Sequence, residues 1–129
     1  MSALETVSDY ISDVRTLLQD TIAPNRYDDA SLLVALNVTL LETRRVRADL
    51  FVFQHHDRVP SFTAVNTVEV RFEQPFRLAL VYGTAAHALA RDQEDVQDAR
   101  SASFMRIFYD MLLGVRVTGI GAPQQQGAA

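Results

Sequence analysis

The sequence predicts a mainly α-helical protein: a bundle-like domain of four helices, with a small β-hairpin between the second and third helices and an extended C-terminal arm. Apolar residues recur at three- and four-residue spacing in four separate stretches, which is the period of a helix face. This periodicity stops between residues 49 and 71, where short alternating stretches are typical of strands. We therefore expect a helical domain at residues 1–114 and a tail at residues 115–129.

The first helix is expected to run from the start of the chain to about Asp20. Ser2 and Glu5 have the spacing of a capping box, in which side chains and backbone donors satisfy each other. Pro24 and Asn25 then predict a loop before the second helix. The apolar face of the first helix comprises Leu4, Val7, Ile11, Val14 and Leu18.

The second helix is the longest, and we expect it to extend from Asp28 or Asp29 to about Ala48. Either carboxylate can accept hydrogen bonds from the free N–H groups of the first turn. Asn37 lies among apolar residues, so we expect its amide to tie the helix to a loop or a neighbouring helix; a ligand contact is the alternative. The expected wide apolar face comprises Leu32, Leu33, Val34, Leu36, Val38, Leu40 and Leu41. The helix ends in a basic cluster, which suits the negative end of its dipole: Arg44, Arg45 and Arg47.

A small β-hairpin is expected between residues 62 and 72. Pro60 disfavours helix here, and residues 67–72 alternate between polar and apolar side chains after a turn at Asn66. A hairpin of this size cannot stand alone, so it must pack on the helices or pair with a neighbouring subunit. Phe62, Val68 and Val70 are therefore candidate interface residues, together with the basic cluster.

The sequence contains no recognisable catalytic or metal-binding motif. His55, His56 and Asp57 are adjacent ligand-type residues, but neighbouring side chains in a loop rarely converge on one ion, so we expect solvated loop residues and no metal. His87 is expected to be a packing residue within a helix. Without a nucleophile motif or a phosphate-binding loop, we expect neither enzymatic activity nor a cofactor.

We expect a third helix over residues 76–91, and Pro75 immediately before it suits the first position of a helix. This helix is apolar on most sides, which indicates burial in the core or between subunits, and Gly83 permits close approach of another helix. Asp92 is expected to cap a fourth helix that ends at Gly114.

The tail after Gly114 carries apolar residues that alternate with polar ones in its first half. A frayed terminus is one interpretation. The other is an arm that becomes ordered on a partner, either as an added strand or in a groove. The residues of this candidate arm are Val115, Arg116, Val117, Thr118 and Ile120.

Composition narrows the possible functions further. The formal charge of −4 disfavours non-specific nucleic-acid binding, which depends on neutralising phosphates. No apolar run approaches the roughly 20 residues that span a bilayer, and we expect no signal peptide or membrane association. The chain has no cysteine, and all 12 of its basic residues are arginine. Arginine suits interfaces, although codon usage in a GC-rich genome would produce the same bias.

The order of these segments resembles that of tailed-bacteriophage head–tail adaptor (connector) proteins. The resemblance covers about residues 4–113, and an ordered set of segments carries it rather than any single motif. These segments are residues 7–20, Tyr27-Asp28-Asp29-Ala30, Leu32-Leu33, Ala35-Leu36-Asn37, residues 44–51, Val59-Pro60-Ser61-Phe62 and Asp92-Gln93-Glu94-Asp95.

The resemblance implies a structural protein of the virion, made in the host cytoplasm and located at the head–tail junction. About twelve copies would form a closed homo-oligomeric ring that joins the portal protein to tail or nozzle proteins. Packaged DNA would pass through the ring without sequence-specific binding. Related adaptors reach the portal with a C-terminal segment, so the arm at residues 115–120 is expected to contact the portal.

Two other functions compete with this interpretation. The first is a small helical DNA-binding regulator, but the loop between the first two helices is longer than a helix-turn-helix turn, and the arginines lie at a helix C-terminus. The second is a small enzyme that uses the histidines and Asp57.

Overall fold

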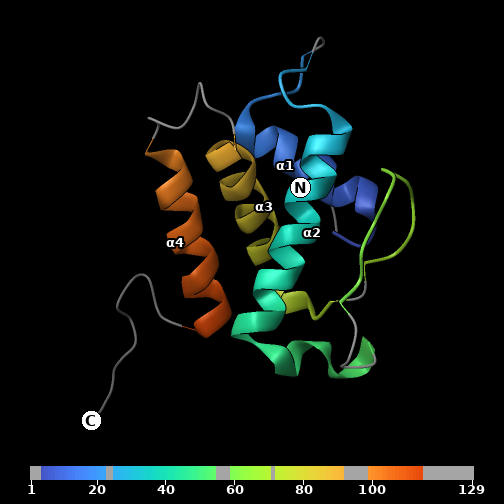
Figure 1. Ribbon diagram of the computed structural model, residues 1–129, viewed down its shortest axis with the longest axis vertical. Helices are drawn as coiled ribbons and strands as arrows, with labels where there is room; N and C mark the ends of the chain where they lie inside the picture. Colours follow the sequence, from blue (N-terminus) through green and yellow to red (C-terminus); the bar gives the residue numbers. More distant parts are fainter. Residues whose placement is uncertain (1–3, 23–24, 55–58, 71, 92–98, 115–129) are drawn as a thin grey trace.

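The computed structural model describes residues 4–22, 25–54, 59–70, 72–91 and 99–114 (Figure 1). The described residues form four α-helices: α1 at Val7–Leu18, α2 at Asp29–Val46, α3 at Arg77–Arg91 and α4 at Arg100–Leu113. Two 3-10 helices connect α2 to α3, η1 at Ala48–Gln54 and η2 at Gln74–Phe76. The predicted mainly α fold is confirmed. The predicted tail, residues 115–129, lies outside the described residues.

Helix α3 is the centre of the domain. It packs against α1, α2 and α4, and Figure 1 shows it between α2 and α4. Its burial follows from its composition, since small and apolar residues leave no side that requires water. The predicted burial of this helix is confirmed, and Pro75 lies in η2 immediately before it. The buried residues of α3 are Ala79, Leu80, Val81, Gly83, Thr84, Ala85, Ala86, Ala88 and Leu89.

Gly83 allows α2 and α4 to approach α3 closely. A Cβ atom built at this position would lie 2.6 Å from Cγ2 of Thr39 in α2 and 2.8 Å from Cδ1 of Phe108 in α4. Both distances are shorter than van der Waals contact, and Thr39 and Phe108 are fully buried. The three helices therefore meet at a point where no side chain other than hydrogen fits.

Helix α1 begins later than the sequence predicts and uses a different capping box. Thr6 is its N-cap: Oγ1 of Thr6 accepts from the backbone N–H of Asp9, and the Asp9 carboxylate accepts from the backbone N–H of Thr6. The expected pair of Ser2 and Glu5 does not form this cap, and Ser2 lies outside the described residues. The predicted apolar face is confirmed for Val7, Ile11, Val14 and Leu18, which are buried in the helix, whereas Leu4 is buried but precedes the helix.

The predicted β-hairpin is wrong, because no strand forms within residues 62–70 and Phe72 lies in a coil. Residues 66–70 instead pair with the chain at the start of α1. The carbonyls of Val68 and Asn66 accept from the backbone N–H groups of Val7 (3.0 Å) and Ser8 (2.9 Å), and the N–H of Val70 donates to the carbonyl of Glu5 (2.8 Å). An isolated antiparallel bridge joins the same two segments.

Residues 66–70 pair with the start of α1 instead of forming a hairpin because the first N–H groups of that helix need acceptors. The first residues of a helix have no carbonyl partner within it, so their donors must be satisfied from elsewhere. The segment at residues 66–70 supplies two of those acceptors and buries Val70 in the core. A short isolated hairpin would satisfy none of them and is only marginally stable.

Helix α2 starts as predicted but ends earlier. Asp28 is its N-cap, with Oδ1 of Asp28 accepting from the N–H of Ser31 at 2.8 Å. The helix stops at Val46, because Arg47 has a non-helical backbone and the chain continues into η1. At the end of α4, Gly114 has a φ of 71° and terminates the helix as predicted. The expected cap of α4, Asp92, lies outside the described residues.

Replacing Gly83 by alanine tests the close helix contact. We expect Gly83→Ala to lower the free energy of unfolding by about 1–3 kcal/mol, the usual cost of overpacking a core, as measured by urea denaturation. Adding Thr39→Ser removes the Cγ2 atom that clashes, so the double variant should recover part of the loss. Alanine normally favours a helix over glycine by about 0.5–1 kcal/mol, so a single variant as stable as wild type would contradict the close contact.

Candidate functional site

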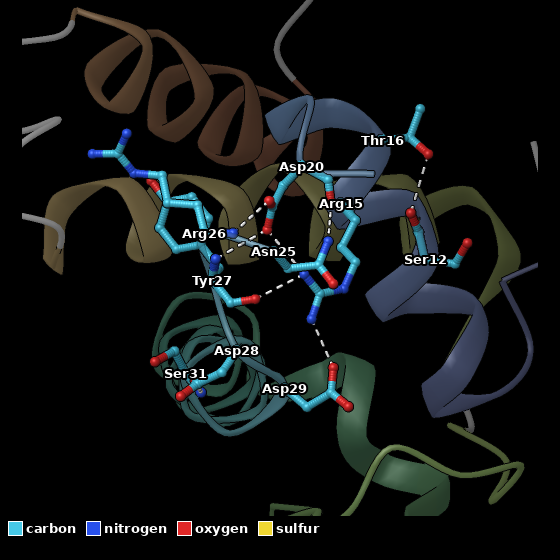
Figure 2. Close-up of polar contacts among 10 residues, drawn as sticks. All are labelled: Ser12, Arg15, Thr16, Asp20, Asn25, Arg26, Tyr27, Asp28, Asp29 and Ser31. Carbon is cyan, nitrogen blue, oxygen red and sulfur yellow. Dashed lines mark hydrogen bonds and ion pairs between the residues drawn. The ribbon is translucent and has the colours of Figure 1, made fainter. Parts of the chain in front are cut away.

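A network of polar contacts around Arg15 joins α1 to the start of α2 (Figure 2). Nη1 of Arg15 donates to Oδ2 of Asp20 at 2.9 Å and to the carbonyl of Tyr27 at 2.8 Å, and Nη2 donates to Oδ1 of Asp29 at 2.7 Å. The guanidinium thus contacts the loop and the first turn of α2 at once. We call Arg15, Asp20 and Asp29 the Arg15 network.

Asp20 shapes the loop between the two helices. Its carboxylate accepts from the backbone N–H groups of Arg26 (2.7 Å) and Tyr27 (3.0 Å), and its carbonyl accepts from Nδ2 of Asn25 (2.8 Å). Only 8% of Asp20 is exposed. A buried carboxylate is tolerated because the two backbone N–H groups and the Arg15 guanidinium compensate its charge. The loop therefore places α2 firmly relative to α1.

A polar cavity of about 560 Å³ lies beside this network. Its lining combines cationic and anionic groups with a hydroxyl and an amide. The lining residues are Asn25, Arg26, Tyr27, Asp28, Ser31, Ala88 and Arg91.

The basic cluster at the end of α2 makes contacts within the chain. Arg47 donates to the carbonyl of Leu112 at the end of α4, pairs with Asp49 at 2.9 Å, and lies over the ring of Phe76 at 5.2 Å. Arg44 lies 6.0 Å from the centroid of the Phe51 ring. Arg47 therefore fastens α2, α4 and η2 together, a role that the sequence did not indicate.

Arg45 is the most exposed of the three arginines, with 69% of its side chain accessible. It donates to the carboxylate of Glu42, which also accepts from the hydroxyl of Tyr109 in α4. The hydrogen bonds from Arg45 hold the pKa of Glu42 below its usual range. This leaves a paired charge, not an isolated cation, at the surface of α2.

The interface residues expected in the hairpin region have different environments. Val70 is 1% exposed and belongs to the core, so its expected place at an interface is corrected. Val68 is exposed. Phe62 is half-buried, and its backbone makes two 2.9 Å hydrogen bonds with the side-chain amide of Asn37. The predicted role of Asn37, fastening α2 to a loop, is confirmed.

Helix α2 carries a second apolar row, which faces away from the core. Val34, Val38 and Leu41 are 40%, 37% and 59% exposed. We call these three residues the outer stripe. The expectation that they widen the core face is wrong, because a rotation of about 100° per residue places them opposite Leu32, Leu36 and Leu40. A helical projection of the sequence shows that the two apolar rows lie on opposite sides of α2. A count of apolar residues does not show this separation.

The histidine and metal hypotheses find no support in the described part of the chain. His55, His56 and Asp57 lie outside it. His87 is half-buried, its Nε2 atom has no hydrogen-bond partner, and burial lowers its pKa, an effect that the Glu42 carboxylate opposes. Within the described ranges, no group of three or more histidine, cysteine or acidic side chains is placed to hold a metal ion.

Among the described helices, none is long and apolar enough to cross a membrane. The candidate arm, Val115, Arg116, Val117, Thr118 and Ile120, lies outside the described residues. The sequence matches no protein-family model, no curated protein and no solved structure. The outer stripe and the exposed residues around it are therefore the best-defined candidate functional surface.

The cap of α2 predicts a pH dependence of stability. The backbone N–H of Ser31 lowers the pKa of Asp28 below its ordinary value of 3.8, so the ionised cap stabilises the fold at neutral pH. This contribution is lost as the pH falls through the folded-state pKa. Asp28→Ser keeps a capping oxygen without the charge. We expect it to be less stable than wild type at pH 7, and the difference in unfolding free energy to vanish near pH 2.

Both proteins share every other titrating group, so those groups cancel in the difference between their urea-unfolding curves. A difference that stays constant from pH 7 to pH 2 would show that the charge of Asp28 contributes nothing to the cap.

Proposed function

We propose that this protein is a structural component of a phage virion, a head-to-tail adaptor that forms a ring between the portal and the tail. The observation that carries the proposal is the outer stripe. A row of three large apolar side chains on the solvent side of a helix is costly for a protein that acts alone, and it is the usual mark of a protein contact. A ring built from one repeated heterologous contact requires such a surface on every copy.

The charges beside the stripe suit the rim of an interface. Glu42 and Arg45 follow Leu41 on the same helix and are paired with each other, and polar groups of this kind surround the apolar centre of many protein contacts. Val68, which is 51% exposed, adds apolar surface from the segment after Phe62. We propose that the outer stripe, Arg44, Arg45, Phe62 and Val68 form the contact between subunits or with the portal.

The partners follow from the resemblance between the order of segments in this chain and that of the head–tail connectors. We propose the portal protein on one side of the ring, tail or nozzle proteins on the other, and passage of packaged DNA through the channel without base-specific contacts. The net negative charge is compatible with such a channel, since fixed negative charge repels phosphate. The arm at residues 115–120 is proposed to contact the portal.

The structure gives less support to a DNA-binding regulator. Arg45 and Arg47 are paired with Glu42 and Asp49, so binding phosphate would require these contacts to break. The connection from Leu18 to Asp29 is also longer than the three- or four-residue turn of a helix-turn-helix.

Charge placed on the outer stripe should prevent assembly without unfolding the domain. We expect Val38→Asp with Leu41→Asp to reduce binding to portal-containing heads by at least about tenfold, because an unpaired carboxylate would be buried in the contact. Sedimentation with heads and negative-stain imaging of the ring measure this loss. Ile22→Asp is the matched control, since Ile22 is 83% exposed and lies outside the stripe. Wild-type binding by the double variant would exclude the stripe as the contact surface.

Removing the arm should weaken attachment to the portal. We expect a chain that ends after Gly114 to sediment with portal-containing heads less well than the full chain, because the apolar arm would contribute buried area at the portal surface. Circular dichroism of both chains controls for folding. Equal binding with and without residues 115–129 would refute the portal role of the arm.

A further inference from the structure

A groove between α1 and α3 has no role in the contacts described so far. Its volume is about 690 Å³. Its lining is partly apolar and partly polar, with Asp13 as its charged member, and none of its residues belongs to the outer stripe. We call the apolar lining residues the floor, Leu17, Leu78, Val81 and Tyr82, and the polar ones the rim, Ser12, Asp13, Thr16 and Gln19.

One end of this groove lies close to the point where the chain leaves α4. Arg47 contacts both the carbonyl of Leu112 and the ring of Phe76, so the last turn of α4 lies beside the start of α3. Leu78, in the groove floor, is two residues beyond Phe76. Helices α3 and α4 run in opposite directions, as shown in Figure 1. The rings of Tyr82 in α3 and Phe104 in α4 also meet, in a T-shaped contact. Residue 115 therefore follows a helix end that adjoins the groove.

The segment at residues 115–120 has the chemistry and the length to fill it. In an extended chain, Val115 and Val117 project to one side and Arg116 and Thr118 to the other, so the valines can face the apolar floor while Arg116 faces the rim. Six extended residues span roughly 20 Å, whereas Leu78 to Tyr82 is only about 6 Å of helix. Arg116 carries the charge opposite to that of Asp13.

We propose that this groove binds residues 115–120 of the same chain. The tether favours the chain's own segment over that of a second copy, because a short connection gives a high effective concentration at the groove. An arm held there is not available to another protein, so any partner that uses the arm must displace it. The contact is a property of the isolated chain and goes beyond the adaptor role; either can hold without the other.

Disulfide trapping in the full-length protein tests the contact, because the chain contains no cysteine of its own. Thr16→Cys with Thr118→Cys places one thiol on the groove rim and one on the rim-facing side of the arm. On mild oxidation we expect a monomeric product with faster mobility on a non-reducing gel and loss of both free thiols. Leu41→Cys with Thr118→Cys is the control and should remain reduced, since Leu41 lies on the outer stripe.

A disulfide-linked dimer of the first variant would assign the groove to a second copy and overturn the same-chain proposal. No disulfide, or equal trapping in the control, would overturn it as well. These outcomes are read in the absence of heads and portal, so they are independent of the head-binding measurements.

A second measurement avoids new cysteines. In the full chain, Val115→Asp with Val117→Asp should release the arm and shift the backbone amide resonances of Leu78, Val81 and Tyr82, while those of the outer stripe stay unchanged. Groove resonances identical in the two proteins would contradict the proposal, and unchanged resonances of the outer stripe control for misfolding.

Discussion

The fold depends on the absence of a side chain at Gly83. Thr39 of α2 and Phe108 of α4 both occupy the space that a Cβ atom would need, so α3 can be enclosed by helices on two sides. The alanines that follow on α3 extend this close packing, and the core fills around them with leucine and aromatic side chains. Because α3 is the common partner of α1, α2 and α4, its narrow surface decides where the other three helices lie.

Polar contacts at both ends of α2 then fix the position and rotation of this helix. The Arg15 network sets the entry of the chain into α2, and Arg47 holds the far end of that helix against α4 and η2. With both ends fastened, α2 cannot rotate to bury Val34, Val38 and Leu41, and these residues remain in solvent. The same contacts that stabilise the monomer therefore create the apolar surface on which the proposed assembly depends.

Local sequence signals predicted the helices well. Most of these signals depend on residues close in sequence: the apolar faces of α1 and α3, the N-cap at Asp28 and the C-terminal glycine at Gly114. The hydrogen bonds of Asn37 were predicted from a single polar side chain among apolar ones. The hairpin failed because the acceptors needed by Val7 and Ser8 come from residues some 60 positions away, and no local pattern marks such a pairing. The contact of Arg47 with the carbonyl of Leu112 was not predicted for the same reason, since these two residues are equally distant in sequence.

By itself, the sequence determined the four α-helices found in the described part of the chain, which of them is most apolar, and where each apolar row lies along its helix. These properties follow from the period of the helical backbone. Only the tertiary structure decided which of the two rows on α2 enters the core and which stays outside. It also decided that the cluster of arginines is largely engaged within the chain, and that a groove lies beside the end of α4. These outcomes depend on contacts between distant segments, where Gly83, Arg15 and Arg47 select one arrangement among several that have the same local pattern.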